Sequence, residues 1–442
     1  MSSWLANTRD AFRTRLWPFP TIAVVLALLL GLGLPELDAR VDAGLPSEVS
    51  DWLFGGDADA ARSLLGAIAS SLITVTALTF SLTVVTLQLA SSQFSPRLLR
   101  TFTRDRFVQT TLALFLATFT YALTVLRAVR GTGDGGGVEL VPQIAVTLAF
   151  VLAVASVLGL VLFLAHLTEQ IRVETMLRNV HGDAVITMQK VLAPRDGSRG
   201  TSESIPSAPP GAHTLLVQDN GFLIWVDEDR LLAIAVEEEV LVSLEVHPGN
   251  FVVEGTPLGS AWAPGGGPLI DEKVERIETR VAACIHVGFE RTSAQDVGYG
   301  LRQLTDVTNK ALSPGINDPT TAIHALGHIS AFLCALADLE CGPQLLRDED
   351  DRVRVVLHRP DLASYVDLGI SQPRRYGAAD PQVLERIFQV LLDLSFRVGP
   401  DQRAVVRDEL ARLRATVAAQ SFDATERAAL DSLGRRVARN LA

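Results

Sequence analysis

Long uncharged stretches alternate with charged segments along the first 170 residues. Four stretches, at 16–35, 63–96, 107–126 and 140–168, are long enough to cross a bilayer as helices, because about 20 residues span its hydrocarbon core. The pattern predicts a membrane α-helical domain of four transmembrane helices over residues 1–170. The first stretch also follows a basic head, as in a signal peptide, but no clear small-x-small cleavage site ends it, so we interpret it as a membrane helix.

The stretch at 63–96 differs from the others because it is polar as well as uncharged. At about 100° per residue its hydroxyl and amide side chains fall into two groups on roughly opposite sides of a helix. The first group, our candidate pore-lining residues, comprises Ser70, Thr74, Ser81, Gln88 and Ser92. The second polar face comprises Thr76, Thr79, Thr83, Thr86 and Gln93. A helix that faces only lipid does not need these groups, so we expect the inner helix of a bundle or an assembly.

The flanking charges predict an orientation in the membrane. Three arginines precede the first stretch (Arg9, Arg13 and Arg15) and four follow the second (Arg97, Arg100, Arg104 and Arg106). The segment between these stretches, residues 36–62, carries seven acids against two arginines. Because positive charge concentrates on the cytoplasmic side, we expect both termini, and everything after the fourth helix, in the cytoplasm.

Beyond residue 170 the pattern changes to that of a water-soluble α+β region. Residues 171–212 predict a juxtamembrane helix and a flexible linker rich in Ser, Pro and Gly. Residues 213–270 predict a small β-rich domain, with short strands at 214–217, 221–226, 231–235, 240–246 and 250–253. The turn at 246–258 resembles that of biotinyl- and lipoyl-type sandwich-barrels, but these strands contain no lysine for such a group.

Residues 271–442 predict a mainly helical cytosolic domain. Helices are expected at 293–312, 319–339, 381–396, 401–419 and 424–440, of which those at 381–396 and 401–419 are amphipathic. Strands are expected at 353–358 and 365–368, while the segment 275–285 fits either a helix or a strand. The helix at 381–396 begins with Asp380 and Pro381, residue types that favour the N-cap and the first helical position.

Composition and charge narrow the class of protein. A mean hydropathy of +0.27 over 442 residues indicates a membrane portion joined to a soluble one. The net charge of −11 argues against nucleic-acid binding. Three cysteines, Cys284, Cys334 and Cys341, without paired spacing indicate no disulfide framework and fit a reducing compartment.

The segment from Ala311 to Ala322, ALSPGINDPTTA, predicts a corner between two helices. Pro314 and Gly315 stop the first helix, and Asp318 can accept hydrogen bonds from the first N–H groups of the next one. An alternative is that Ser313, Asn317 and Asp318 form a cytosolic motif whose oxygen atoms bind an ion or a partner. We favour the rigid corner, since each residue already has a backbone role there.

Other candidate chemistry is limited. His324 and His328 have the i, i+4 spacing of a metal pair, but only Asp318 offers a third ligand, and we predict no metal and no cofactor. His166 and Glu169, near the end of the fourth stretch, form a candidate proton sensor, although such a pair is commonly a solvated helix end. The absence of nucleophile-elbow, phosphate-loop, dinucleotide and Cys-x-x-Cys patterns leads us to expect no enzyme.

Two motifs together carry a family resemblance. One is QLASSQFSPR at 88–97, and the other is QLTDVTNKALSPGINDP at 303–319. The chain resembles, over nearly its full length, the uncharacterised bacterial family of predicted membrane proteins known as domain of unknown function 2254. The resemblance implies an integral protein of the bacterial inner membrane. It implies no activity, cofactor or catalytic residue.

Two classes of function follow. In the first, the second membrane helices of several subunits line a path for an ion or small solute, and the cytosolic domains form a vestibule or gate. In the second, the membrane domain is an anchor or scaffold and the cytosolic domain senses or binds a regulator. The two polar faces of residues 63–96 favour the channel-like homo-oligomer in the lipid bilayer.

Overall fold

A computed structural model describes residues 17–41, 53–93, 105–130, 141–195 and 205–442. The chain divides into two compact units, Met1–Arg172 and Val173–Ala442. Six of the arginines on which the predicted orientation depends, at 9, 13, 15, 97, 100 and 104, lie outside the described residues. Residues 94–96, the end of the second uncharged stretch, lie outside them as well.

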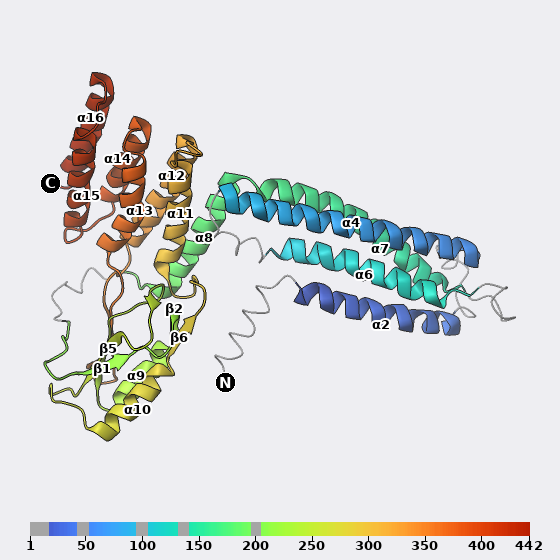
Figure 1. Ribbon diagram of the computed structural model, residues 1–442, viewed down its shortest axis with the longest axis horizontal. Coiled ribbons are helices and arrows are strands. Elements are labelled where there is room, and N and C mark those ends of the chain that lie inside the picture. Colours follow the sequence, from blue (N-terminus) through green and yellow to red (C-terminus); the bar gives the residue numbers. More distant parts are fainter. Residues whose placement is uncertain (1–16, 42–52, 94–104, 131–140, 196–204) are drawn as a thin grey trace. The chain divides into compact units, whose positions relative to one another are not determined.

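α6 is the central helix of the first unit (Figure 1). It runs from Arg106 to Ala128 and contacts α2 (Pro18–Val41), α4 (Ala58–Gln93) and α7 (Gln143–Gln170). Of its apolar span, 44% is buried, against 22% for α4. We expected the stretch at 63–96 to be an inner helix of a bundle or of an assembly. Within one chain the inner helix is α6. α4 could therefore be an inner helix only in an assembly of several subunits.

Five helices of the described residues are long and apolar enough to cross a membrane. Four of them are the helices of the first unit, and the fifth is α12 (Pro319–Leu336) of the second unit. The apolar side chains of Ile329, Phe332 and Leu333 in α12 are fully buried. The membrane-protein class therefore has structural support, while the number of four transmembrane helices stays a prediction.

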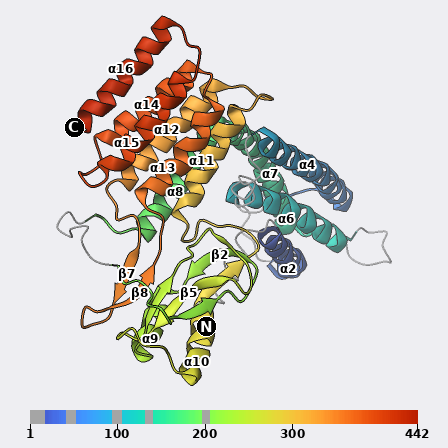
Figure 2. The same cartoon turned by 60° about the vertical axis from the view of Figure 1, so that its left-hand side comes forward.

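The strands of the second unit form two open sheets (Figure 2). The five-stranded sheet has the order β1 (His213–Leu216), β5 (Pro257–Trp262), β3 (Leu241–Leu244), β8 (Val353–Leu357) and β7 (Gln344–Arg347). The three-stranded sheet has the order β4 (Phe251–Val252), β2 (Gly221–Val226) and β6 (Ile285–Gly288). The β3–β8 pair is parallel, with Val242 opposite Val355, and the other named pairs are antiparallel.

The expectation of a small β sandwich-barrel was wrong for the described residues. No barrel closes, because β6, β7 and β8 come from beyond residue 270 and extend the sheets instead. The expected strand at 231–235 is also wrong, since it lies in α9 (Glu228–Glu237). Asp227 caps this helix by accepting a hydrogen bond from the backbone N–H of Arg230. The buried Leu231, Ile234 and Ala235 follow the helical period.

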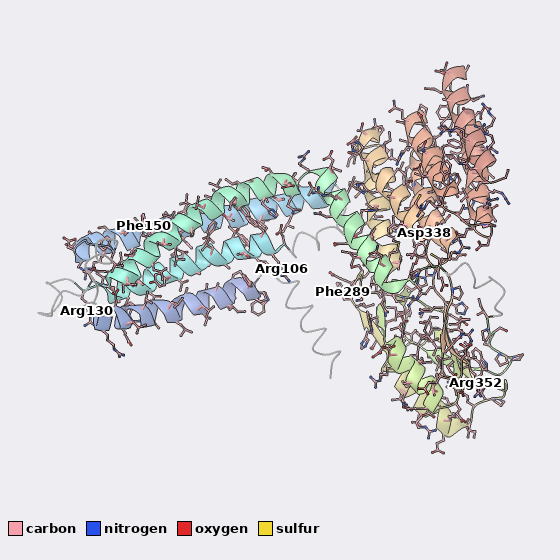
Figure 3. The ribbon with its side chains drawn as sticks, turned by 180° about the vertical axis from the view of Figure 1, so that it is seen from behind. Arg106, Arg130, Phe150, Phe289, Asp338 and Arg352 are labelled. Carbon is pink, nitrogen blue, oxygen red and sulfur yellow. The ribbon has the colours of Figure 1, made fainter. Side chains whose placement is uncertain are left out.

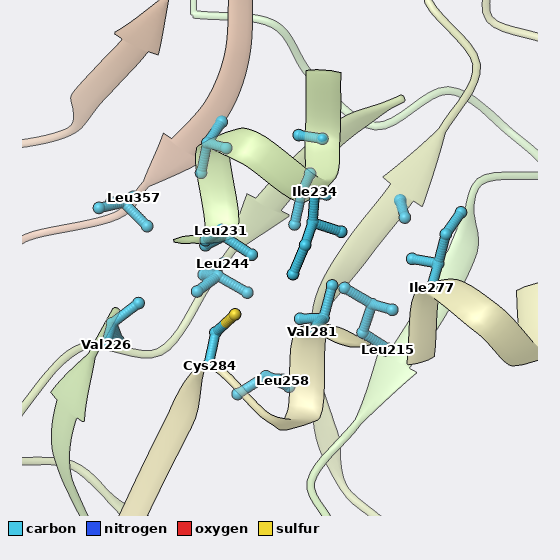
Figure 4. Packing of buried hydrophobic residues seen from close by; sticks show 14 of the residues in the cluster. Leu215, Val226, Leu231, Ile234, Leu244, Leu258, Ile277, Val281, Cys284 and Leu357 are labelled. Carbon is cyan, nitrogen blue, oxygen red and sulfur yellow. The ribbon is translucent and has the colours of Figure 1, made fainter. Parts of the chain in front are cut away.

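A hydrophobic core joins α9 to the sheets and to α10 (Asp271–Ala282) (Figure 4). Leu231 and Ile234 of α9 belong to the same buried cluster as Leu244 of β3, Val281 of α10 and Cys284. Burial raises the pKa of the Cys284 thiol to about 11, so this cysteine is a core residue and not a reactive one.

Seven further helices lie in the described part of the second unit. They are α8 (Val173–Val191), α11 (Val297–Ala311), α12, α13 (Leu362–Tyr376), α14 (Pro381–Ser395), α15 (Arg403–Ala418) and α16 (Ala424–Asn440). α12 contacts α8, α11, α13 and α14, which explains the burial of its apolar residues. The strand expected at 365–368 was wrong, because these residues lie inside α13, where Asp361 accepts a hydrogen bond from the N–H of Ser364 and caps the helix.

Candidate functional site: the two polar faces of α4

α4 begins at a capped and charged end and is uncharged afterwards. The side chain of Asp57 accepts a hydrogen bond of 2.8 Å from the backbone N–H of Ala60. Arg62 pairs with Asp59 at 3.7 Å and donates to the carbonyl of Val129 after α6 at 3.3 Å. From Ser63 to Gln93 the helix has no charged side chain. These contacts fix the N-terminal end of α4 against the end of α6 and do not involve the polar faces of the helix.

The second polar face points into the bundle. Thr76, Thr79, Thr83 and Thr86 are all buried, with Thr79 fully so. Each hydroxyl donates to the backbone carbonyl four residues earlier in α4, at 2.7 to 2.8 Å. Such bonds satisfy a hydroxyl without a partner helix or water. This face is a packing surface.

The candidate pore-lining face points out of the bundle. Ser70, Thr74, Ser81 and Gln88 are exposed. The hydroxyls of Ser70 and Thr74 donate to the carbonyls of Ala67 and Ser70, each at 3.1 Å. Ser81 and Gln88 form no side-chain hydrogen bond with the described residues. The side chains of Ser92 and Gln93 lie outside the described part, so their predicted place stays a prediction.

The outward polar residues of α4 belong to a regular row of exposed positions along the helix. The positions of this row follow one another at alternating intervals of four and three residues. They are Ser63, Ala67, Ser70, Thr74, Ala77, Ser81, Val84 and Gln88. A mean interval of 3.5 residues is the repeat of left-handed helix pairs. We call these eight residues the α4 seam. The polar pattern of the sequence predicted four of these residues, namely Ser70, Thr74, Ser81 and Gln88. The other four, Ser63, Ala67, Ala77 and Val84, join the seam because they are exposed in the structure.

Large apolar side chains flank the seam. Ile73, Leu78, Phe80 and Val85 are 46 to 57% exposed, although they are among the most apolar residues of the helix. The neighbouring helix α7 also turns apolar side chains outward, including Phe150, which is labelled in Figure 3. Such surfaces suit lipid, whereas a row of hydroxyls and an amide does not.

The candidate proton sensor has a different partner from the one expected. The Nε2 atom of His166 lies 2.5 Å from Oδ2 of Asp105, and its ring lies 4.6 Å from that of Phe107. The other oxygen of Asp105 caps α6 by accepting from the N–H of Phe107. Glu169 is exposed on α7. Asp105 could not be predicted as the partner from local spacing, because it lies 61 residues from His166 in the chain.

The polar side chains at the predicted corner between α11 and α12 form hydrogen bonds with nearby residues of the same segment. One oxygen of Asp318 accepts from the N–H of Thr321 at 3.1 Å, and the other accepts from the Thr321 hydroxyl at 2.6 Å. These bonds hold the pKa of Asp318 below its usual value. The Ser313 hydroxyl donates to the carbonyl of Lys310, and Asn317 adopts a positive φ of 50°. The geometry favours a rigid corner over an ion site.

A third histidine joins the pair on α12. The ring centroid of His181 on α8 lies 5.2 Å from that of His328, while His324 is exposed on the same helix as His328. Burial lowers the pKa of both His181 and His328, and the neighbouring ring lowers that of His328 further. No group of three or more His, Cys, Asp or Glu among the described residues could hold a metal ion. The cluster is a contact between two neutral imidazoles near pH 7.

These observations define a class: a helical membrane protein whose second unit is built from two open sheets and a helical bundle. The chain belongs to the family described as "Predicted membrane protein (DUF2254)", which its residues 13–393 match. It is 34% identical over 423 residues to uncharacterized proteins of Mycobacterium bovis and Mycobacterium tuberculosis. Each match covers 95% of this chain and 79% of the relative. No solved structure matches the chain.

Proposed function

We propose that the protein is a homo-oligomeric channel of the bacterial inner membrane, in which the α4 seams of several copies surround a path for an ion or small solute. The observation that carries this proposal is the exposure of Ser70, Thr74, Ser81 and Gln88 on a helix whose other outward side chains suit lipid. Rings of hydroxyls and amides can replace part of the hydration shell of a solute without a fixed charge.

The proposal includes an orientation and a role for the second unit. Both termini and residues 173–442 lie in the cytoplasm, where the second unit forms a vestibule or gate. The mechanism has no catalytic step and requires no cofactor. One chain is insufficient, because its described helices leave the α4 seam uncovered on one side.

The same face also supports a second candidate, a membrane scaffold or sensor without a path. Ala67, Ala77 and Val84 alternate with the polar members of the seam, and small residues at such intervals let two helices approach closely. Ser70 and Thr74 already bond carbonyls of their own helix. In this candidate the seams of neighbouring copies form a dry contact.

Flux through sealed liposomes distinguishes the two candidates. We expect the purified protein to pass small ions, measured with entrapped fluorescent indicators across a range of pH and voltage. Ser81→Leu and Gln88→Leu should each lower the flux at least about tenfold, because rings of leucine form apolar constrictions that exclude water. Thr83→Val is the matched control, since it removes a hydroxyl from the buried face of the same helix.

Each outcome has a clear meaning. Loss of flux in the two leucine variants with a normal oligomer on size-exclusion chromatography supports the channel. Absence of flux in the wild-type protein, with an intact oligomer, rejects the channel and leaves the scaffold. A strict monomer in mild detergent and in lipid nanodiscs would reject both uses of the α4 seam.

A further inference from the structure

A cleft between α15 and α16 is lined by polar and apolar groups together. Its volume is about 370 Å³, within the range of small-molecule sites. Its apolar part is formed by Leu410 and Ala411 of α15, by Ala438 of α16, and by Leu441 and Ala442, which follow α16. Arg407 and Arg414 supply long basic side chains to the same lining.

The two arginines of the cleft are held in fixed positions. They are seven residues apart on α15, so they share one helix face and stand about 10 Å apart along the axis. Arg407 donates to the carbonyl of Leu441 at 2.9 Å, and Arg414 donates to the carbonyl of Gly434 at 2.8 Å. Each bond uses one of the five N–H groups of a guanidinium. Neither guanidinium forms a further hydrogen bond with the described residues.

Arg407 and Arg414 differ from the nearby Arg412 in their ion pairs. Arg412, on the same helix, pairs with Asp367 at 3.3 Å and with Glu409 at 3.6 Å. Arg407 and Arg414 form no ion pair with a carboxylate side chain of the described residues. Residues 403–442 carry eight arginines against five acids, in a chain whose net charge is −11. The cleft therefore contains two guanidinium groups without a side-chain ion pair among the described residues, in an acidic protein.

We propose that this cleft binds a small dianion with an apolar body, whose two carboxylate, phosphate or sulfonate groups reach Arg407 and Arg414. The two guanidiniums set the separation of the acidic groups, and the leucine and alanine side chains between them contact the body. Charge-assisted hydrogen bonds to guanidinium give such recognition both strength and geometry. α15 and α16 lie beyond residue 393, where the family match ends. The site is independent of the channel proposal.

Calorimetric titration of the full-length protein in detergent tests the cleft. The probe is 2,6-naphthalenedisulfonate, a rigid dianion whose sulfonates lie at opposite ends of an apolar ring system. We expect saturable binding of one probe per chain. Arg407→Gln and Arg414→Gln should each weaken the affinity at least about tenfold, which is the effect of losing a hydrogen bond to a charged group. Arg412→Gln, the matched control, should bind like the wild type.

A second variant separates binding from the integrity of α16. Since Arg407 and Arg414 also bond backbone carbonyls at the end of α16, their loss weakens its packing as well. Ala411→Phe keeps both bonds and fills the cleft, so it should abolish binding of the probe. Wild-type affinity in Ala411→Phe, equal losses in Arg412→Gln and Arg414→Gln, or no saturable binding would each overturn the proposal. Inorganic phosphate binding as tightly as the probe would overturn it too, because the apolar body would then contribute nothing.

Discussion

α4 and α12 are both apolar enough to cross a membrane, yet their surroundings differ. α12 lies among four helices of the second unit, and 44% of its span is buried, whereas the figure for α4 is 22%. Phe332 of α12 is fully buried, and Phe80 of α4 is 57% exposed. Apolar composition therefore does not separate a helix covered by protein from one that needs lipid or another subunit. Burial of the individual side chains does.

The largest expected effect tests this comparison with one substitution in each helix. Phe332→Ala should destabilise the second unit by about 3–5 kcal/mol, because it removes a large side chain from a filled core. Phe80→Ala should change stability by less than about 0.5 kcal/mol, because its side chain is exposed in the single chain. Thermal unfolding of both variants in detergent, followed by circular dichroism, measures the difference. A loss in Phe80→Ala as large as that in Phe332→Ala would show that α4 is as enclosed as α12.

A smaller effect is expected at the close contact between α8 and α11. A Cβ atom on Gly300 of α11 would lie 2.3 Å from the Cβ of Ala184 on α8. Gly300→Ala should therefore push the two helices apart and cost about 1–3 kcal/mol. Gly182→Ala on α8 is the control, since its new Cβ would meet no atom within 4 Å, and it should stabilise the helix slightly. Equal melting temperatures for the two variants would contradict the close approach of α8 and α11.

The smallest effect concerns pH and the contact between α8 and α12. Because burial holds the pKa of His181 and His328 below the usual 6.5, the unfolded chain binds protons first as the pH falls. The stability from this contact is full above pH 6.5 and falls as the pH drops from there toward the folded pKa values. His324 also lowers the pKa of His328, and Asp318 interacts in turn with His324.

Melting temperatures from neutral to mildly acidic pH measure this dependence. The wild-type protein should lose more stability on acidification than His328→Phe, in which an apolar ring replaces the second imidazole. His324→Gln is the control, because His324 is exposed and its removal should alter the profile little. Identical profiles for the wild type and His328→Phe would exclude the pair as the source of the pH dependence.

Local signals predicted much of the helical fold. The helix at 424–440 has the bounds of α16, and Asp380 and Pro381 begin α14 as their residue types suggest. The corner at Asp318 is also where the sequence placed it. These features depend on neighbouring residues, so a cap or a period is visible in the chain itself.

Features that depend on distant residues were not predictable in this way. The apolar run at 231–235 suggested a strand, but the period of α9 is helical and its partners come from α10 and β3. The strands at 344–347 and 353–357 complete a sheet that begins at residue 213. For α4, the sequence placed polar groups on two sides, and the packing of α6 determined which side is covered. The α15–α16 cleft likewise depends on two helices that pack against each other.

The parallel pairing of β3 with β8 has a consequence for biosynthesis. β3 ends at Leu244 and is an inner strand of its sheet, but its neighbour begins at Val353. A ribosome adding about 5–20 residues per second makes β8 several seconds or more after β3. During that interval one edge of β3 remains open to mispairing with other nascent chains. A fragment that stops at residue 270 keeps that edge exposed permanently, so any soluble fragment chosen for expression should extend past Leu357.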